Sequence, residues 1–218
     1  MALEVVERPA DGPTERILLL LPGFCDEPST WTDRLDHVDP DRRWHVAVPR
    51  PPVQTRGGPG WYRVSADGPN QTELSESIVA LAELVSSLLE QHSLTEDDLV
   101  VVGFSQGGAT SLATLLDPAV GIRPRALGVL AGYLPHREDD LDPSLAAGMP
   151  VLFVHGSDDE MMDIVRGRSA ARALDRAGAV VTWTEVESRH RLGPPLVDPL
   201  RIWLDAVAAG AVPSDPPT

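Results

Sequence analysis

The chain has 218 residues, 42% of them hydrophobic, which is enough for one sizeable core and excludes a wholly disordered chain. Its formal net charge is −15, and all 18 basic residues are arginine. Such a charge repels nucleic-acid phosphates and anionic membrane surfaces, so neither is expected as a partner. The one cysteine, Cys25, excludes an internal disulfide and fits a reducing compartment.

The N-terminal segment MALEVVERPADGPTER has neither the basic start nor the apolar stretch of a signal peptide. The apolar run that follows, ILLLL at residues 17–21, is too short to span a bilayer. We therefore expect a cytoplasmic protein without a membrane span.

Short apolar runs predict buried strands, and most of them lack the polar alternation of a half-exposed strand. The last run alternates more and fits the edge of a sheet. In chain order these runs are residues 17–21, 44–48, 99–102, 126–131, 151–154 and 180–186.

Helical patterns fall between these runs. One follows Asn70, which with Glu73 resembles a capping pair, and a second begins directly after Ser105 and ends by Asp117. Two more fit residues 163–176 and 199–208. Alternating strands and helices predict an α/β fold, with a single doubly wound, mostly parallel sheet covered by helices on both faces.

No internal repeat or second domain is evident, so residues 1–210 are expected to form a single domain. Residues 50–69 form a long loop rich in glycine and proline, and long loops in compact domains are often functional. The tail, residues 211–218, is expected to be disordered.

The sequence Gly103-Phe104-Ser105-Gln106-Gly107 matches the pattern G-x-S-x-G between a predicted strand and a predicted helix. In such a sharp turn the serine oxygen stands clear of the sheet, and flanking glycines relieve the crowding. The amide of Gln106, at a helix N-terminus, is placed to stabilise an oxyanion. The alternative is a serine that merely caps the helix.

A nucleophilic serine needs a base, and the base needs an acid, which in this fold follow in the order serine, acid, histidine. His190 comes after the last predicted strand and has no rival beyond position 155. The acid stays open at this point, because Asp158, Asp159 and Asp163 all lie in the preceding loop. The earlier histidines are interpreted as surface or loop residues: His37, His45, His92 and His136.

The chain resembles the phospholipase/carboxylesterase family of α/β-hydrolases, which includes acyl-protein thioesterases. This resemblance implies a serine hydrolase without a metal or organic cofactor and without a large cap domain. It also implies that the acid is Asp159, the last residue of an H-G-x-x-D pattern. The matching segments are LLLLPGF (18–24), GWY (60–62), VVVGFSQGGA (100–109), GYLP (132–135), VLFVHGSDDEMM (151–162) and the segment around His190.

The family usually has L-H-G-x-G-D in the first loop, where this chain has Pro22 and Cys25 in place of the histidine and the second glycine. The second oxyanion donor is expected to be the amide of Phe24, and Cys25 to be a small packing residue. The candidate substrate-binding residues are Trp61, Tyr62, Phe104, Met161 and Met162. For the two loop aromatics, Trp61 and Tyr62, the alternative is an exposed latch. For the two methionines, the alternative is packing in the core.

We therefore predict a serine hydrolase that cleaves small-molecule carboxylic esters through Ser105, His190 and Asp159. The alternatives are a thioesterase that removes acyl chains from proteins or lipids, an inactive binding module with this fold, and a cofactor-free perhydrolase or haloperoxidase. The sequence leaves open whether the protein is a monomer or a homodimer.

Overall fold

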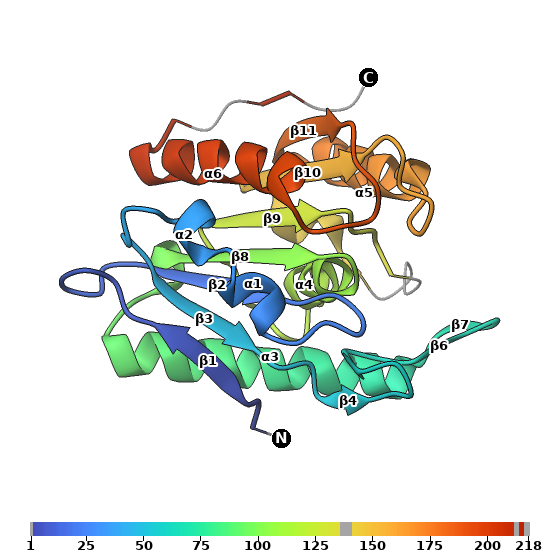
Figure 1. Ribbon diagram of the computed structural model, residues 1–218, viewed down its shortest axis with the longest axis horizontal. Helices are drawn as coiled ribbons and strands as arrows, with labels where there is room; N and C mark the ends of the chain where they lie inside the picture. Colours follow the sequence, from blue (N-terminus) through green and yellow to red (C-terminus); the bar gives the residue numbers. More distant parts are fainter. Residues whose placement is uncertain (1, 136–140, 212–213, 216–218) are drawn as a thin grey trace.

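The computed structural model describes residues 2–135, 141–211 and 214–215, and its central feature is a seven-stranded sheet (Figure 1). The strand order is β1-β3-β2-β8-β9-β10-β11, parallel throughout except for β1, which pairs antiparallel with β3. The bounds are β1 Val5–Arg8, β2 Ile17–Leu21, β3 His45–Pro49, β8 Leu99–Phe104, β9 Ala126–Leu130, β10 Pro150–Gly156 and β11 Val180–Val186.

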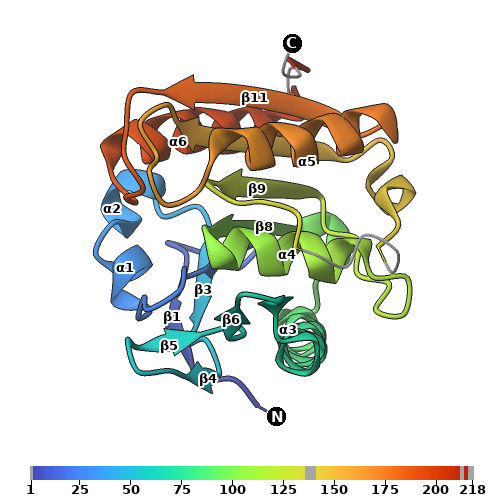
Figure 2. The ribbon, with the colours of Figure 1, turned by 90° about the vertical axis from the view of Figure 1, so that its right-hand side faces the viewer.

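Helices cover both faces of the sheet, so the prediction of a doubly wound α/β fold is confirmed. One hydrophobic cluster joins the sheet to α3 (Gln71–His92), α4 (Gln106–Leu116) and α5 (Ile164–Arg176). A second cluster joins the other face to α1 (Ser29–Thr32), α2 (Leu35–Val38) and α6 (Pro194–Ala209). Figure 2 shows α1 and α2 on the opposite side of the sheet from α3 and α4.

The predicted helix starts agree with the structure at two caps. The side chain of Asn70 accepts a hydrogen bond from the amide of Glu73, and that of Asp163 accepts one from Val165. The last helix begins at Pro194 rather than at residue 199, because proline is well tolerated in the first helical turn. The described residues also form two short 3-10 helices, η1 (Glu96–Asp98) and η2 (Pro143–Ala146).

The loop at residues 50–69 holds two small hairpins outside the main sheet. One pairs β4 (Val53–Gln54) with β5 (Pro59–Gly60), and the other pairs β6 (Val64–Ser65) with β7 (Gly68–Pro69). Both lie near the carboxyl ends of the parallel strands (Figure 1). The loop is therefore a structured segment that adjoins the end of the sheet where sites of α/β folds form.

The chain after α6 returns to the sheet at residues 214–215. The amide of Asp215 donates to the carbonyl of Val181 over 2.8 Å, and the carbonyl of Asp215 accepts from Trp183 over 2.7 Å. Asp215 thereby forms an isolated parallel bridge with Thr182 of the edge strand β11, whereas disorder of residues 211–218 as a whole stays a prediction. The rest of that prediction, at residues 212–213 and 216–218, lies outside the described residues. Within the described ranges, no helix has the length and apolar character needed to cross a bilayer.

Candidate active site

Ser105 lies in the turn between β8 and α4, with φ of 53° and ψ of −117°. A non-glycine residue with positive φ is strained, and the packing around this turn holds it in place. A Cβ on Gly107 would lie 2.4 Å from the carbonyl oxygen of Leu21, and one on Gly103 would lie 2.4 Å from the backbone of Gly107. Glycine is therefore required on both sides of Ser105, as the sequence pattern predicts.

His190 joins Ser105 to Asp159. The Nε2 atom of His190 lies 2.8 Å from Ser105 Oγ, and its Nδ1 atom lies 2.7 Å from Asp159 Oδ2. The three residues follow β8, β10 and β11, whose carboxyl ends lie at the same end of the sheet. The Asp159 side chain is fully buried and that of His190 is 15% exposed. This geometry can pass a proton from the hydroxyl to the imidazole while the carboxylate orients the ring.

The structure distinguishes among the three candidate acids. Only Asp159 contacts His190, and its Oδ1 atom accepts hydrogen bonds from the amides of Met161, at 3.0 Å, and Met162, at 2.8 Å. Asp163 instead caps α5, and Asp158 is exposed. The two backbone donors fix the carboxylate so that its other oxygen faces the imidazole.

A second histidine, His155 at the end of β10, supports the same loop. Its Nε2 atom donates to the carbonyl of Met162 over 2.9 Å and lies 3.6 Å from Asp159 Oδ2. The ring stacks on Trp183, and a Cβ on Gly167 would come within 2.6 Å of Nδ1. Burial lowers the pKa of His155, so the ring is neutral at pH 7. Sequence reasoning missed this role, although the residue opens the H-G-x-x-D pattern.

The loop after β2 carries the expected oxyanion donor, Phe24. The amide of Gly23 donates to Asp26 Oδ2 over 3.1 Å, and a Cβ on Gly23 would lie 3.3 Å from Ser105 Cβ. The amides of Phe24 and Gln106 have no hydrogen-bond acceptor among the described residues. Both donors are therefore free to bind an oxyanion. Cys25 is exposed in a left-handed turn with φ of 65°, so it does not pack in the core, but a Cβ on Gly57 would lie 2.7 Å from its Sγ, so it packs against the 50–69 loop.

The side chain of Gln106 holds the 50–69 loop against the elbow. Its Oε1 atom accepts from the amide of Trp61 over 2.9 Å, and its Nε2 atom donates to the carbonyl of Tyr62 over 2.7 Å. Trp61 and Tyr62 are fully buried, and Tyr62 is hydrogen-bonded to Tyr133 through their hydroxyls. A pocket wall or an exposed latch would expose side-chain surface to a substrate, and these two side chains expose none. Trp61 and Tyr62 instead pack beneath the surface and hold the 50–69 loop against the elbow.

The remaining substrate-binding candidates differ in how exposed their side chains are. Phe104 is buried and stacks on the ring of His190, with centroids 5.1 Å apart. Met161 is 78% exposed and Met162 is partly buried, so the alternative that both pack in the core fails for Met161. Phe24 is 45% exposed. Exposed apolar side chains therefore lie on the loop after β2 and on the loop that carries Asp159.

Among the early histidines, His45 differs from the prediction made from the sequence. His45 is 6% exposed in β3, so it is a buried residue and neither a surface nor a loop residue. It starts a strand at the opposite end of the sheet from Ser105. His136 lies outside the described residues.

A family model described as phospholipase/carboxylesterase matches residues 1–205. Acyl-protein thioesterase 1 of Debaryomyces hansenii is 24% identical over 193 residues, which cover 76% of this chain and 79% of that protein. A rice relative named as a probable inactive carboxylesterase is 28% identical over 154 residues, or 63% of this chain and 60% of that one. The crystal structure of the Bacillus cereus carboxylesterase has a TM-score of 0.81 at 21% identity, covering 94% of each chain.

The fold, with its serine elbow and the hydrogen-bonded histidine and aspartate, defines an α/β-hydrolase. The chain belongs to the phospholipase/carboxylesterase family, and it is a hydrolase of the carboxylesterase type. The resemblance found in the sequence motifs is confirmed.

Proposed function

We propose that the protein cleaves carboxylic esters by acyl transfer to Ser105. The observation that carries this proposal is the continuous hydrogen-bonded chain Ser105 Oγ–His190 Nε2 at 2.8 Å and His190 Nδ1–Asp159 Oδ2 at 2.7 Å. An inactive binding module would not need to maintain this chain together with a strained serine backbone. The geometry therefore favours catalysis over the binding alternative.

The reaction has two steps that use the same groups. His190 takes the proton of Ser105 as its oxygen attacks the ester carbonyl, and the free amides of Phe24 and Gln106 stabilise the oxyanion. His190 then protonates the leaving alcohol, and an acyl-enzyme ester remains on Ser105. Water, activated by His190, attacks this ester and releases the carboxylic acid.

Hydrolysis of thioesters is the second candidate activity, since relatives of this chain are named acyl-protein thioesterases. The exposed ring of Phe24 and the exposed thioether of Met161 provide apolar surface on the loops of the oxyanion amide and of Asp159, where an acyl chain could bind. The same serine chemistry serves oxygen and sulfur leaving groups. Substrate preference therefore depends on acyl length and on the leaving group.

The test is the hydrolysis of p-nitrophenyl esters of increasing acyl length, and of matched thioesters, by the wild type and Ser105→Ala. We expect turnover by the wild type and its loss, by roughly 10⁶-fold, in the variant. Ser157→Ala is the control, because Ser157 is an exposed serine directly after β10 and, within the described residues, forms no hydrogen bond with Ser105 or His190. A fluorophosphonate probe should label the wild type and the control but not Ser105→Ala.

Two results would contradict the proposal. Equal turnover by Ser105→Ala and the wild type would place the nucleophile elsewhere. A wild type that neither hydrolyses any of these substrates nor reacts with the fluorophosphonate would favour the binding module. A preference for thioesters over esters of the same acyl length would assign the second activity.

A further inference from the structure

Three potential metal ligands meet at the end of the sheet opposite to Ser105. They are Glu7 on β1, His45 at the start of β3 and His92, the last residue of α3. One ligand atom from each lies within 4.8 Å of those from the other two. The place can be followed in Figure 1, where the C-terminal end of α3 lies beside the start of β3, away from the carboxyl ends of the strands.

The strand register explains why these side chains share one face. Glu7 pairs with Ala47 in the β1–β3 ladder, and Ala47 packs in the cluster under α3. His45 lies two residues before Ala47, and residues two apart in a strand point to the same face. Glu7 and His45 are therefore diagonal neighbours on the face that α3 covers. The last turn of α3 brings His92 against them.

The contacts in this cluster leave ring nitrogens without partners. Glu7 Oε2 lies 2.6 Å from His45 Nε2, and the rings of His45 and His92 have centroids 4.2 Å apart. Nδ1 of His45 and Nε2 of His92 are buried and have no hydrogen-bond partner among the described residues. His45 is 6% exposed, so its unpartnered nitrogen is withdrawn from bulk water. Buried polar atoms without partners are rare and call for a ligand or another explanation.

The charge state of the cluster suits a cation. Glu7 supplies a carboxylate, and its side chain is 37% exposed. The net charge of −15 also attracts cations to the protein.

We propose that Glu7, His45 and His92 bind a divalent transition-metal ion of the zinc type. Two imidazoles and one carboxylate are the donors that this class of ion takes in proteins, with a water molecule in the fourth position. Ligand atoms about 2.1 Å from a tetrahedral ion lie about 3.4 Å apart. Glu7 Oε2 and His45 Nε2 are closer than this, at 2.6 Å, and the three ligand atoms lie within 4.8 Å of one another. Binding an ion therefore requires the Glu7 carboxylate to move back from His45 and the His92 ring to move closer. The bound ion would link β1, β3 and the end of α3.

The test uses untagged protein freed of metal by a chelator and then titrated with Zn²⁺ by calorimetry and with Co²⁺ by visible absorption. We expect one ion per chain, the intense absorption of four- or five-coordinate Co²⁺, and a rise in Tm with Zn²⁺. Glu7→Gln and His92→Gln should each weaken binding by at least about tenfold and reduce the rise in Tm.

The control is His37→Gln, since His37 is an exposed histidine of α2, packed against α6 on the other face of the sheet. It should bind Zn²⁺ like the wild type. The proposal fails if the wild type shows no saturable binding of Zn²⁺. It also fails if Glu7→Gln and His92→Gln bind the ion as tightly as His37→Gln does, because the ion would then be held elsewhere. Glu7 is exposed, so its variant tests the site even where a histidine variant folds poorly.

Discussion

At the scale of single residues, Asp26 holds the loop that presents the amide of Phe24. Its carboxylate accepts from the amide of Gly23 over 3.1 Å and from the side chain of Thr30. We predict that Asp26→Ala lowers kcat by about tenfold or more with a smaller change in KM, because a displaced oxyanion donor weakens transition-state binding most. The measurement is steady-state hydrolysis of a p-nitrophenyl ester.

Asp26→Asn is the matched variant, because its amide oxygen can still accept from Gly23. Burial raises the pKa of Asp26, so keeping this carboxylate charged at pH 7 costs folding free energy. The asparagine variant is therefore expected to retain most of kcat and to unfold at the same or a higher urea concentration than the wild type. Equal kcat values for the alanine variant and the wild type would show that the loop keeps its shape without this side chain.

The residue scale also shows how much of the site the sequence could predict. The elbow pattern and chain order predicted Ser105 and His190 as partners, because each follows a predicted strand, and the structure places their side chains 2.8 Å apart. They could not choose among three carboxylates within six positions, since the choice depends on which one the backbone amides of the turn bind. The sequence also could not predict the hydrogen bonds from the Gln106 side chain to Trp61 and Tyr62. These residues lie 45 and 44 positions earlier and meet Gln106 only in the folded protein.

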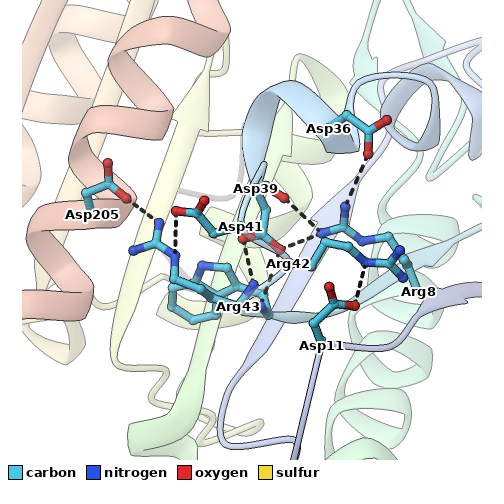
Figure 3. Close-up of polar contacts among 9 residues, drawn as sticks. Arg8, Asp11, Asp36, Asp39, Asp41, Arg42, Arg43 and Asp205 are labelled. Atoms are coloured by element: carbon cyan, nitrogen blue, oxygen red, sulfur yellow. Dashed lines mark hydrogen bonds and ion pairs between the residues drawn. The ribbon is translucent and has the colours of Figure 1, made fainter.

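At the scale of elements, β1 is anchored by a buried ion pair between Arg8 and Asp39, which precedes β3 (Figure 3). Asp39 is fully buried and also accepts from the amides of Arg43, at 3.0 Å, and Trp44, at 3.3 Å. We predict that Arg8→Ala lowers the free energy of unfolding by about 3 kcal/mol, because it leaves a buried carboxylate without its cation. Urea denaturation monitored by tryptophan fluorescence measures this change.

The control for this prediction is Asp11→Ala. It removes an ion pair with Arg42, also drawn in Figure 3, whose side chains are 68% and 43% exposed. Exposed ion pairs contribute about 0–1 kcal/mol, so this variant should remain close to the wild type. A similar small loss in both variants would mean that the two backbone amides alone satisfy Asp39.

The strands that the sequence predicted differ from the strand β1 that it missed in length and in local apolar pattern. Residues 17–21 and 180–186 were placed with their final bounds, because each is a continuous strand flanked by residues that end it. The strand β1 was missed, because it is a four-residue antiparallel edge with no fully buried position. Its pairing with β3 depends on the ladder and on Arg8 rather than on a local apolar pattern.

At the scale of the whole molecule, the two histidines with lowered pKa values link folding to pH. Burial lowers the pKa of His155 and of His92 in the folded protein, whereas in the unfolded chain each has a pKa near 6.5. Below about pH 6.5 the unfolded chain therefore binds protons that the folded protein does not. The free energy of unfolding should fall as the pH is lowered from about 6.5, with a slope of up to about 1.4 kcal/mol per pH unit for each histidine.

His155→Gln separates the contribution of this histidine from those of the carboxylates, because glutamine does not titrate and can still donate to the Met162 carbonyl. We predict a flatter dependence of unfolding free energy on pH between about 6.5 and 5 than in the wild type, since one proton-uptake site of the unfolded chain is removed. Urea denaturation at several pH values gives both curves. Parallel curves over this range would mean that His155 takes up its proton equally in the folded and unfolded states. The ring would then be open to water, and His155 would not act as a neutral hydrogen-bond donor that supports the Asp159 loop.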